Sequence, residues 1–139
     1  IFEAARGCGA TINHRPMHVS VCTQLRRALV VTGFVYDRGL ALELPMRRFA
    51  RMQMVCEGLR RDGSAALDMA HTACGRFDAF FELRLNPWDV AAGFVLVTEA
   101  GGRITRGDGA AATVFDGDVV ATNAHLHDEL LTVLGEVAP

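Results

Sequence analysis

The sequence contains no lysine, and all 14 of its basic residues are arginine, set against 16 acidic residues and a net charge of −2. The arginines stand among acidic residues instead of forming one basic stripe, so we expect them on a solvated surface and not against a nucleic acid. No apolar run reaches the ~18 residues that a membrane-spanning helix needs. We therefore expect neither a nucleic acid nor a membrane as a partner.

Motifs that hold metals or disulfides through cysteine are also missing. The four cysteines, Cys8, Cys22, Cys56 and Cys74, show no C-x-x-C spacing and no paired framework. Free thiols in a reducing cytoplasm are the simplest interpretation, so we expect a cytoplasmic protein. The five histidines lack metal-binding spacing, and we expect His125 and His127 to face solvent at the start of the last helix.

What is present is a hydrophobic chain with alternating strand and helix patterns. Half of its 139 residues are hydrophobic and the mean hydropathy is +0.21, which suits a single domain over residues 1–139. Gly7 and Gly9 do not precede a helix, so a hairpin is a better interpretation than a dinucleotide-binding loop. We predict short strands in 1–21, strands at 29–32, 79–85 and 119–122, and helices at 40–56, 64–75, 87–100 and after Asn123. This alternation predicts an α/β fold with a sheet covered by helices on both faces.

The segment Asn86-Pro87-Trp88-Asp89 has the pattern of a helix start. Asn86 can cap the helix, Pro87 suits its first position, and Asp89 follows where backbone N–H groups and the helix dipole favour a carboxylate. From the residues alone, Asp89 is either an ordinary helix-start acid or a ligand for a hard metal ion, which prefers such fixed carboxylates. We expect the apolar helix from Pro87 to Ala100 to be buried, with Trp88 in the core.

Two further positions could contact a small ligand. Gly63-Ser64-Ala65 lies where a turn enters a helix, so it is either a capped turn or a place where free N–H groups meet substrate oxygens. Glu82 lies near a predicted strand end, where α/β folds gather ligand sites, although a solvated carboxylate is the ordinary alternative. Phe80 and Phe81 are expected in the core.

Several motifs, taken in order, resemble the inositol monophosphatase family. They are Ala5-Arg6-Gly7-Cys8-Gly9-Ala10, Gly63-Ser64-Ala65-Ala66, the run from Ala73 to Glu82, Trp88-Asp89-Val90-Ala91-Ala92-Gly93, Thr98-Glu99-Ala100-Gly101-Gly102 and Ala121-Thr122-Asn123. The family's Asp-Pro-x-Asp-Gly-Thr motif and its upstream glutamate are absent. The chain thus resembles the C-terminal half of the enzyme, which implies the C-terminal α/β layers of an αβαβα sandwich with a mixed sheet.

The resemblance also implies a function. It implies a Mg²⁺-dependent, lithium-sensitive phosphatase, usually a homodimer, that hydrolyses inositol monophosphate or another small sugar phosphate with metal-activated water. It makes Asp89 a metal ligand and catalytic residue, places Gly63, Ser64 and Ala65 around the substrate, and assigns Glu82 to a cyclitol hydroxyl. The site needs the N-terminal half, so we expect the 139-residue chain alone to be inactive. The alternatives are a fructose bisphosphatase, a nucleotide 3′-phosphatase, or a non-catalytic fragment that binds a partner.

Overall fold

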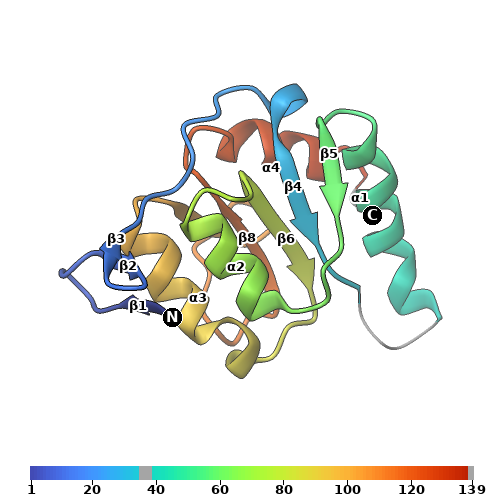
Figure 1. Cartoon of the computed structure of the whole chain (residues 1–139). Helices are drawn as coiled ribbons and strands as arrows, with labels where there is room; N and C mark the ends of the chain where they lie inside the picture. The colour runs from blue at the N-terminus through green and yellow to red at the C-terminus, as the bar shows by residue number, and fades with distance from the viewer. Residues whose placement is uncertain (35–38, 138–139) are drawn as a thin grey trace.

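A mixed sheet of five strands, in the order β5-β4-β6-β8-β7, forms the centre of the computed structural model, which describes residues 1–34 and 39–137. The strands are β4 (Leu29–Thr32), β5 (Gly58–Arg60), β6 (Ala79–Leu83), β7 (Arg103–Thr105) and β8 (Asp118–Thr122). β4 runs parallel to both β5 and β6, whereas β8 is antiparallel to β6 and β7. The carboxyl ends of β4, β5 and β6 therefore meet at one edge of the sheet, the lower edge in Figure 1.

Helices cover both faces of this sheet, as the alternation of strands and helices predicted (Figure 1). The helices are α1 (Glu43–Gln53), α2 (Ala65–Ala73), α3 (Pro87–Glu99) and α4 (His127–Gly135), with short 3-10 turns η1 (Leu25–Arg27) and η2 (Leu40–Leu42). Successive residues of a strand point to opposite faces. Phe80 accordingly packs in the core under α2 and α3, and its neighbour Phe81 packs in the core under α1 and α4. Both phenylalanines are buried, as expected.

The first residues form a separate small sheet of three strands, β1 (Phe2–Ala4), β2 (Ala10–Ile12) and β3 (Arg15–Pro16), which packs beside α3. Gly7 and Gly9 both have φ +77°, a backbone conformation that glycine adopts without strain, and they form the turn between β1 and β2. The Glu99 carboxylate at the end of α3 accepts hydrogen bonds from the N–H groups of both glycines at 2.8 Å. The predicted hairpin is confirmed, and the rejected dinucleotide loop is absent from this described segment.

Several local expectations need correction. The predicted helix 40–56 is shorter: it runs from Glu43 to Gln53, and Pro45 lies in its first turn, where no intrahelical N–H bond is lost. The short strands β5 and β7 were not predicted, because each contains only 3 residues and shows no clear alternation. The four cysteines are free thiols, as expected.

Two polar residues that we expected at the surface are buried. His127 is 0% exposed, and its two ring nitrogens lie 2.9 and 2.8 Å from the hydroxyls of Thr122 and Thr105. Burial, and secondarily the nearby charge of Arg103, lowers the pKa of His127 to about 4. Arg48 is also buried, with its guanidinium 3.4 Å from the Asp118 carboxylate. The sequence pattern around His127 and Arg48 could not predict that they are buried, because their burial depends on partners from distant elements.

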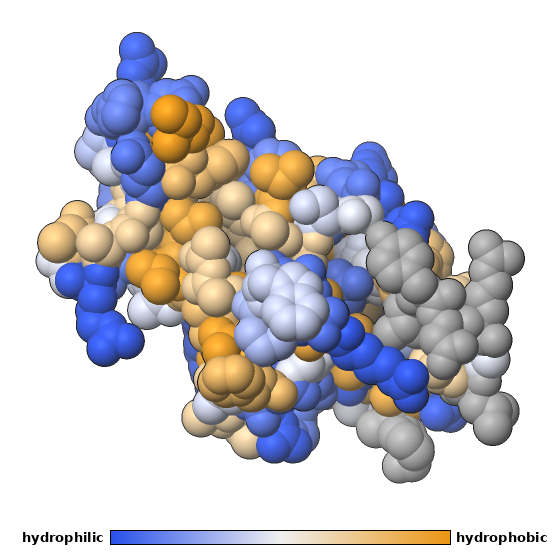
Figure 2. Space-filling view, turned by 90° about the horizontal axis from the view of Figure 1, so that it is seen from below, coloured by the Kyte–Doolittle hydropathy of each residue, from blue (hydrophilic) through white to orange (hydrophobic). Residues whose placement is uncertain are grey.

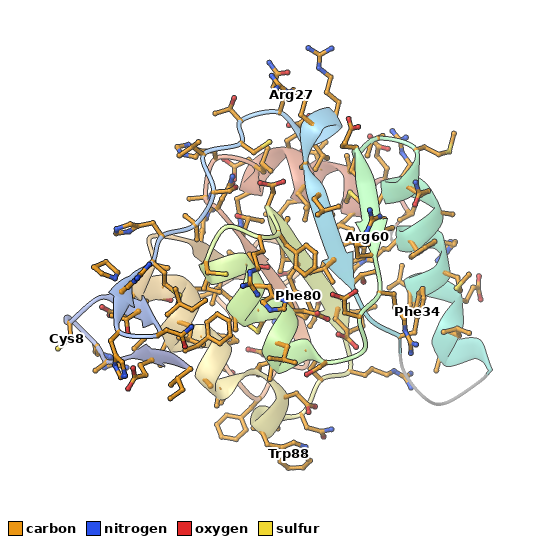
Figure 3. The ribbon with its side chains drawn as sticks, in the orientation of Figure 1. Cys8, Arg27, Phe34, Arg60, Phe80 and Trp88 are labelled. Atoms are coloured by element: carbon orange, nitrogen blue, oxygen red, sulfur yellow. The ribbon has the colours of Figure 1, made fainter. Side chains whose placement is uncertain are left out.

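The helix α3 is only partly buried, contrary to expectation. Its buried positions are Val90, Gly93, Leu96 and Val97, while the opposite side is open. Trp88 is 78% exposed and projects from the lower edge in Figure 3, so it is not a core residue. Gly93 allows close packing against α2, because a Cβ at that position would lie 2.5 Å from the sulfur of Met69. No helix among the described residues is both long and apolar enough to cross a membrane.

Candidate active site

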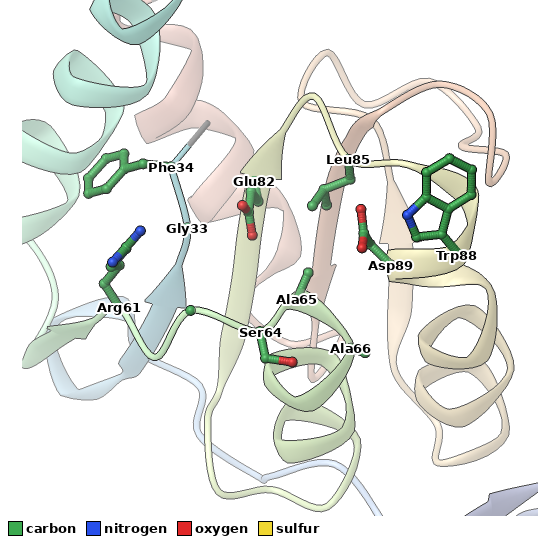
Figure 4. Close-up of a pocket in the computed structure, with 11 residues that line it drawn as sticks. Gly33, Phe34, Arg61, Ser64, Ala65, Ala66, Glu82, Leu85, Trp88 and Asp89 are labelled. Atoms are coloured by element: carbon green, nitrogen blue, oxygen red, sulfur yellow. The ribbon is translucent and has the colours of Figure 1, made fainter. Parts of the chain in front are cut away.

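A pocket of about 230 Å³ opens at the edge where β4, β5 and β6 end. It gathers segments that are far apart in the sequence: the end of β4, the turn after β5, the end of β6 and the first turns of α2 and α3. Its lining residues are Gly33, Phe34, Arg61, Gly63, Ser64, Ala65, Ala66, Glu82, Leu85, Trp88 and Asp89. The five residues that we singled out from the sequence, Gly63, Ser64, Ala65, Glu82 and Asp89, are all among them (Figure 4).

Asp89 is fixed by the start of α3. Its Oδ2 accepts a hydrogen bond of 2.9 Å from the backbone N–H of Asn86, which confirms the predicted role in capping the helix. Its Oδ1 receives no hydrogen bond from any residue that the structure describes. One carboxylate oxygen is thus held in place while the other remains free to bind a ligand, so capping and ligand binding are compatible here.

Glu82 lies in the middle of the pocket, over the backbone of Gly33. A Cβ at position 33 would overlap the Glu82 carboxyl group, so only glycine leaves room for it. Burial, together with the negative charges of Asp68 and Asp89, raises the pKa of Glu82 to about 7, and Arg61 opposes this rise. A nearby cation, or hydroxyl groups that donate hydrogen bonds, would stabilise the charged form of such a carboxyl group.

The turn Gly63-Ser64-Ala65 leads directly into α2. Gly63 has φ +90°, which a residue with a side chain would adopt only with strain. The Ser64 hydroxyl accepts a hydrogen bond of 3.4 Å from the N–H of Leu67, so Ser64 is the predicted helix cap. The first N–H groups of a helix have no partner within it, and Ala65 and Ala66, the first two residues of α2, line the pocket. An anionic group is the natural ligand for such N–H groups.

Two charged residues at this edge were not identified from the sequence. Asp68 in α2 is 0% exposed, and neither of its carboxylate oxygens has a hydrogen-bond partner among the described residues. Burial, and secondarily the charge of Asp62, raises the pKa of Asp68 to about 7. Arg61 lines the pocket, although we had grouped it with the solvated arginines. Asp68 lies on the same helix face as Ala65 and Thr72, which could have indicated that it is buried. A single acidic residue on such a face does not show which residues from other elements surround it.

The donor set fits a hard cation only in part. Asp89 offers a carboxylate oxygen without a hydrogen-bond partner among the described residues, and Glu82 lies near enough for the charge of Asp89 to add to the burial that raises its pKa. Mg²⁺ prefers such oxygen donors but needs about six of them, including water. Within residues 1–34 and 39–137, however, no three His, Cys, Asp or Glu side chains are arranged to hold a metal ion.

The surface around the pocket is mixed in character. Figure 2 views the molecule from below, toward the edge that carries the pocket, and shows polar side chains interspersed with apolar ones. The exposed Trp88 lies on this edge and contributes to the pocket wall. The site is therefore open to small polar solutes, and its chemistry is dominated by carboxylates and helix N–H groups.

The sequence of this chain is similar to those of known proteins. The sequence model described as the inositol monophosphatase family matches residues 1–137. The chain is 43% identical to an inositol-1-monophosphatase of Synechocystis sp. over 96% of its own length and 47% of that protein. It is 40% identical to the Nus factor SuhB of Pseudomonas aeruginosa, over 96% of its own length and 50% of that protein.

Solved structures agree with the sequence comparison. The structure of inositol monophosphatase from Anabaena (Nostoc) sp. superimposes with a TM-score of 0.95 at 44% identity, covering 99% of this chain and 55% of that one. The chain thus spans about half the length of the relatives that it matches. The mixed five-stranded sheet with helices on both faces is the arrangement that the resemblance implied. From its sequence and its fold, this chain is a member of the inositol monophosphatase family.

Proposed function

We propose that the protein carrying this chain is a Mg²⁺-dependent phosphomonoesterase that hydrolyses inositol monophosphate to inositol and phosphate. The observation that carries the proposal is the convergence of Asp89, Glu82 and the N-terminus of α2 on one pocket of a family member. The relative from Synechocystis sp. is named for this activity. A pocket of about 230 Å³ suits a small phosphorylated ring.

Each residue has a separate task in this proposal. The Oδ1 of Asp89 would hold Mg²⁺, while Oδ2 remains bonded to the N–H of Asn86. The N–H groups at the start of α2, from Ser64 to Ala66, follow the turn at Gly63 and donate hydrogen bonds to the phosphate oxygens, as expected at a helix N-terminus. Glu82 accepts hydrogen bonds from hydroxyls of the cyclitol ring. Mg²⁺, when bound, supplies the positive charge that offsets the phosphate and activates a water for in-line attack.

The proposal requires more than this chain. Because the described residues offer no complete metal site, the other ligands and the water-activating residues belong to a further part of the protein. We therefore propose that the 139-residue chain alone is inactive and binds Mg²⁺ weakly. The whole protein is proposed to be lithium-sensitive and homodimeric. Fructose bisphosphate and nucleotide 3′-phosphates remain the alternative substrates.

A second candidate function is partner binding without catalysis. Relatives from several bacteria carry the name Nus factor SuhB, and the chain is 40% identical to one of them. Turnover distinguishes the two candidates, since a purely partner-binding protein would not hydrolyse inositol 1-phosphate at any Mg²⁺ concentration.

The decisive experiment replaces Asp89 by asparagine in the full-length protein. Asp89→Asn keeps the size and the capping oxygen but removes the charge, so we expect kcat to fall by at least about a hundredfold. Lithium inhibition should weaken in parallel. Asp108→Asn is the control, because Asp108 is an exposed acid paired with Arg106 outside the pocket. Normal kcat in Asp89→Asn would leave Asp89 as a capping residue and refute the proposal.

Glu82 is tested by comparing substrates. Glu82→Gln should raise KM for inositol 1-phosphate by about ten- to a hundredfold, the cost of a lost hydrogen bond to a charged group. The effect should be smaller for glycerol 2-phosphate, which lacks the ring. Equal losses with both substrates would assign Glu82 to structure or metal binding instead of ring recognition.

A further inference from the structure

The pocket has a cationic wall that the proposed reaction does not use. Arg61 follows β5 and lies on the opposite side of Glu82 from Asp89 and Trp88 (Figure 4). Among the lining residues that the structure describes, it is the one cation. Its guanidinium carbon lies 5.9 Å from the centre of the Phe34 ring, close enough for a cation–π contact.

Phe34 gives this wall a fixed backing. Its ring packs against the ring of Phe49 from α1, with the two centroids 5.4 Å apart. Arg61 itself makes no ion pair with any described residue, so its donors stay available. Its charge nevertheless reaches the pocket, since it opposes the rise in the pKa of Glu82. The guanidinium therefore lies over the ring of Phe34, and its N–H groups remain available to bind a ligand.

The spacing across the sheet places Arg61 at the far end of a bound substrate. β4 lies between β5 and β6, and neighbouring strands are about 4.8 Å apart, so roughly 10 Å separates the strand before Arg61 from the strand that carries Glu82. A phosphate held at Asp89 and the start of α2 therefore leaves the opposite end of a sugar or cyclitol facing Arg61. A guanidinium binds a carboxylate or phosphate through two parallel hydrogen bonds, which a lone hydroxyl cannot match.

We propose that Arg61 forms an anion subsite, so that the pocket also accepts phosphate esters with a second anionic group, phosphate or carboxylate, distal to the phosphate that is hydrolysed, and favours them over their counterparts with an uncharged distal group. This inference rests on the proposed function, because it assumes which end of the substrate reacts. It makes Arg61 a specificity-determining residue whose contribution depends on the charge of the distal group.

The experiment compares three substrates with one carbon skeleton on the full-length protein: glucose 6-phosphate, gluconate 6-phosphate and glucose 1,6-bisphosphate. We expect kcat/KM to be about ten- to a hundredfold higher for the two compounds with a second anion, the range for a charged hydrogen-bonded pair. Arg61→Gln should remove most of this preference, and Arg61→Lys should restore part of it. A preference for one compound alone identifies phosphate or carboxylate as the distal group.

The controls separate this inference from the proposed function. Arg26→Gln replaces an exposed arginine at η1, outside the pocket, and should keep the full preference. Dissociation constants for glucose 6-phosphate and glucose 1,6-bisphosphate, measured by calorimetry, test Arg61 even if none of the compounds is hydrolysed. Absence of turnover of inositol 1-phosphate by the parent, assayed alongside these compounds, would refute the phosphatase proposal and would leave the binding test of Arg61 intact. The anion subsite would be overturned if the parent showed no preference for compounds with a second anion in binding or turnover. It would also be overturned if Arg61→Gln kept that preference.

Discussion

Asp68 provides a test of the structure that does not depend on catalysis. Its carboxyl group, on the inward side of α2, is buried, and both oxygens lack hydrogen-bond partners among the described residues. Burial, with a smaller contribution from Asp62, raises its pKa from an ordinary 3.8 to about 7. A buried charge without a partner destabilises the folded state. The variant Asp68→Asn keeps the shape of the side chain and cannot ionise, so it should be more stable wherever the parent carboxyl group is charged.

The sign and size of the effect follow from the pKa of Asp68. Because the pKa is higher in the folded state than in the unfolded chain, Asp68 destabilises the parent increasingly as pH rises from about 4 to 7, and constantly above 7. The full shift would correspond to about 4 kcal/mol. Local relaxation and water penetration reduce the cost of a buried charge, and we expect about half of that value. Asp68→Asn should thus gain about 2 kcal/mol at pH 8 and almost nothing near pH 4.

Urea unfolding followed by far-UV circular dichroism measures this difference. The parent and Asp68→Asn are compared at several pH values between 4.5 and about 8, in buffers with a chelator so that no divalent cation occupies the pocket. Asp128→Asn is the control, because this exposed carboxylate pairs with Arg103 at 2.8 Å and should matter by less than about 1 kcal/mol. A variant that is less stable than the parent at pH 8, or whose gain is independent of pH, would refute the reasoning.

Three further predictions concern other parts of the fold. His127→Gln should lower the free energy of unfolding by about 1–3 kcal/mol at pH 7, because it disrupts the buried hydrogen bonds of the imidazole. It should also flatten the acid dependence of unfolding, since the parent loses stability as the pH falls from 6.5 toward the lowered pKa of about 4. An unchanged urea midpoint would contradict this. Glu99→Ala should speed amide hydrogen exchange at the two hairpin glycines, which it holds at 2.8 Å, and unchanged exchange would show that the hairpin does not need it. Gly93→Ala should destabilise by about 1–3 kcal/mol through contact with Met69, as thermal unfolding would reveal, whereas an unchanged midpoint would show that α2 and α3 separate easily.

The elements with strong local signals were predictable. The cap at Ser64, the capping interaction of Asp89 with Asn86, and the buried strand β8 each depend on residues that are close in sequence. Local hydrogen-bonding and periodicity rules apply directly to such segments. Errors arose where burial is decided by distant partners. Trp88 follows a strong apolar pattern yet is exposed, and His127 follows a polar pattern yet is buried between Thr105 and Thr122.

The sequence by itself determined the types of most elements, the family resemblance and five of the residues that line the pocket. The tertiary structure alone decided that these residues share one edge of the sheet, because β4, β5 and β6 are parallel and their ends meet there. It also decided the surroundings of Glu82, whose pKa responds to Asp68, Asp89 and Arg61 from three other segments. Electrostatic environment depends on distances through space, and a linear pattern does not contain those distances.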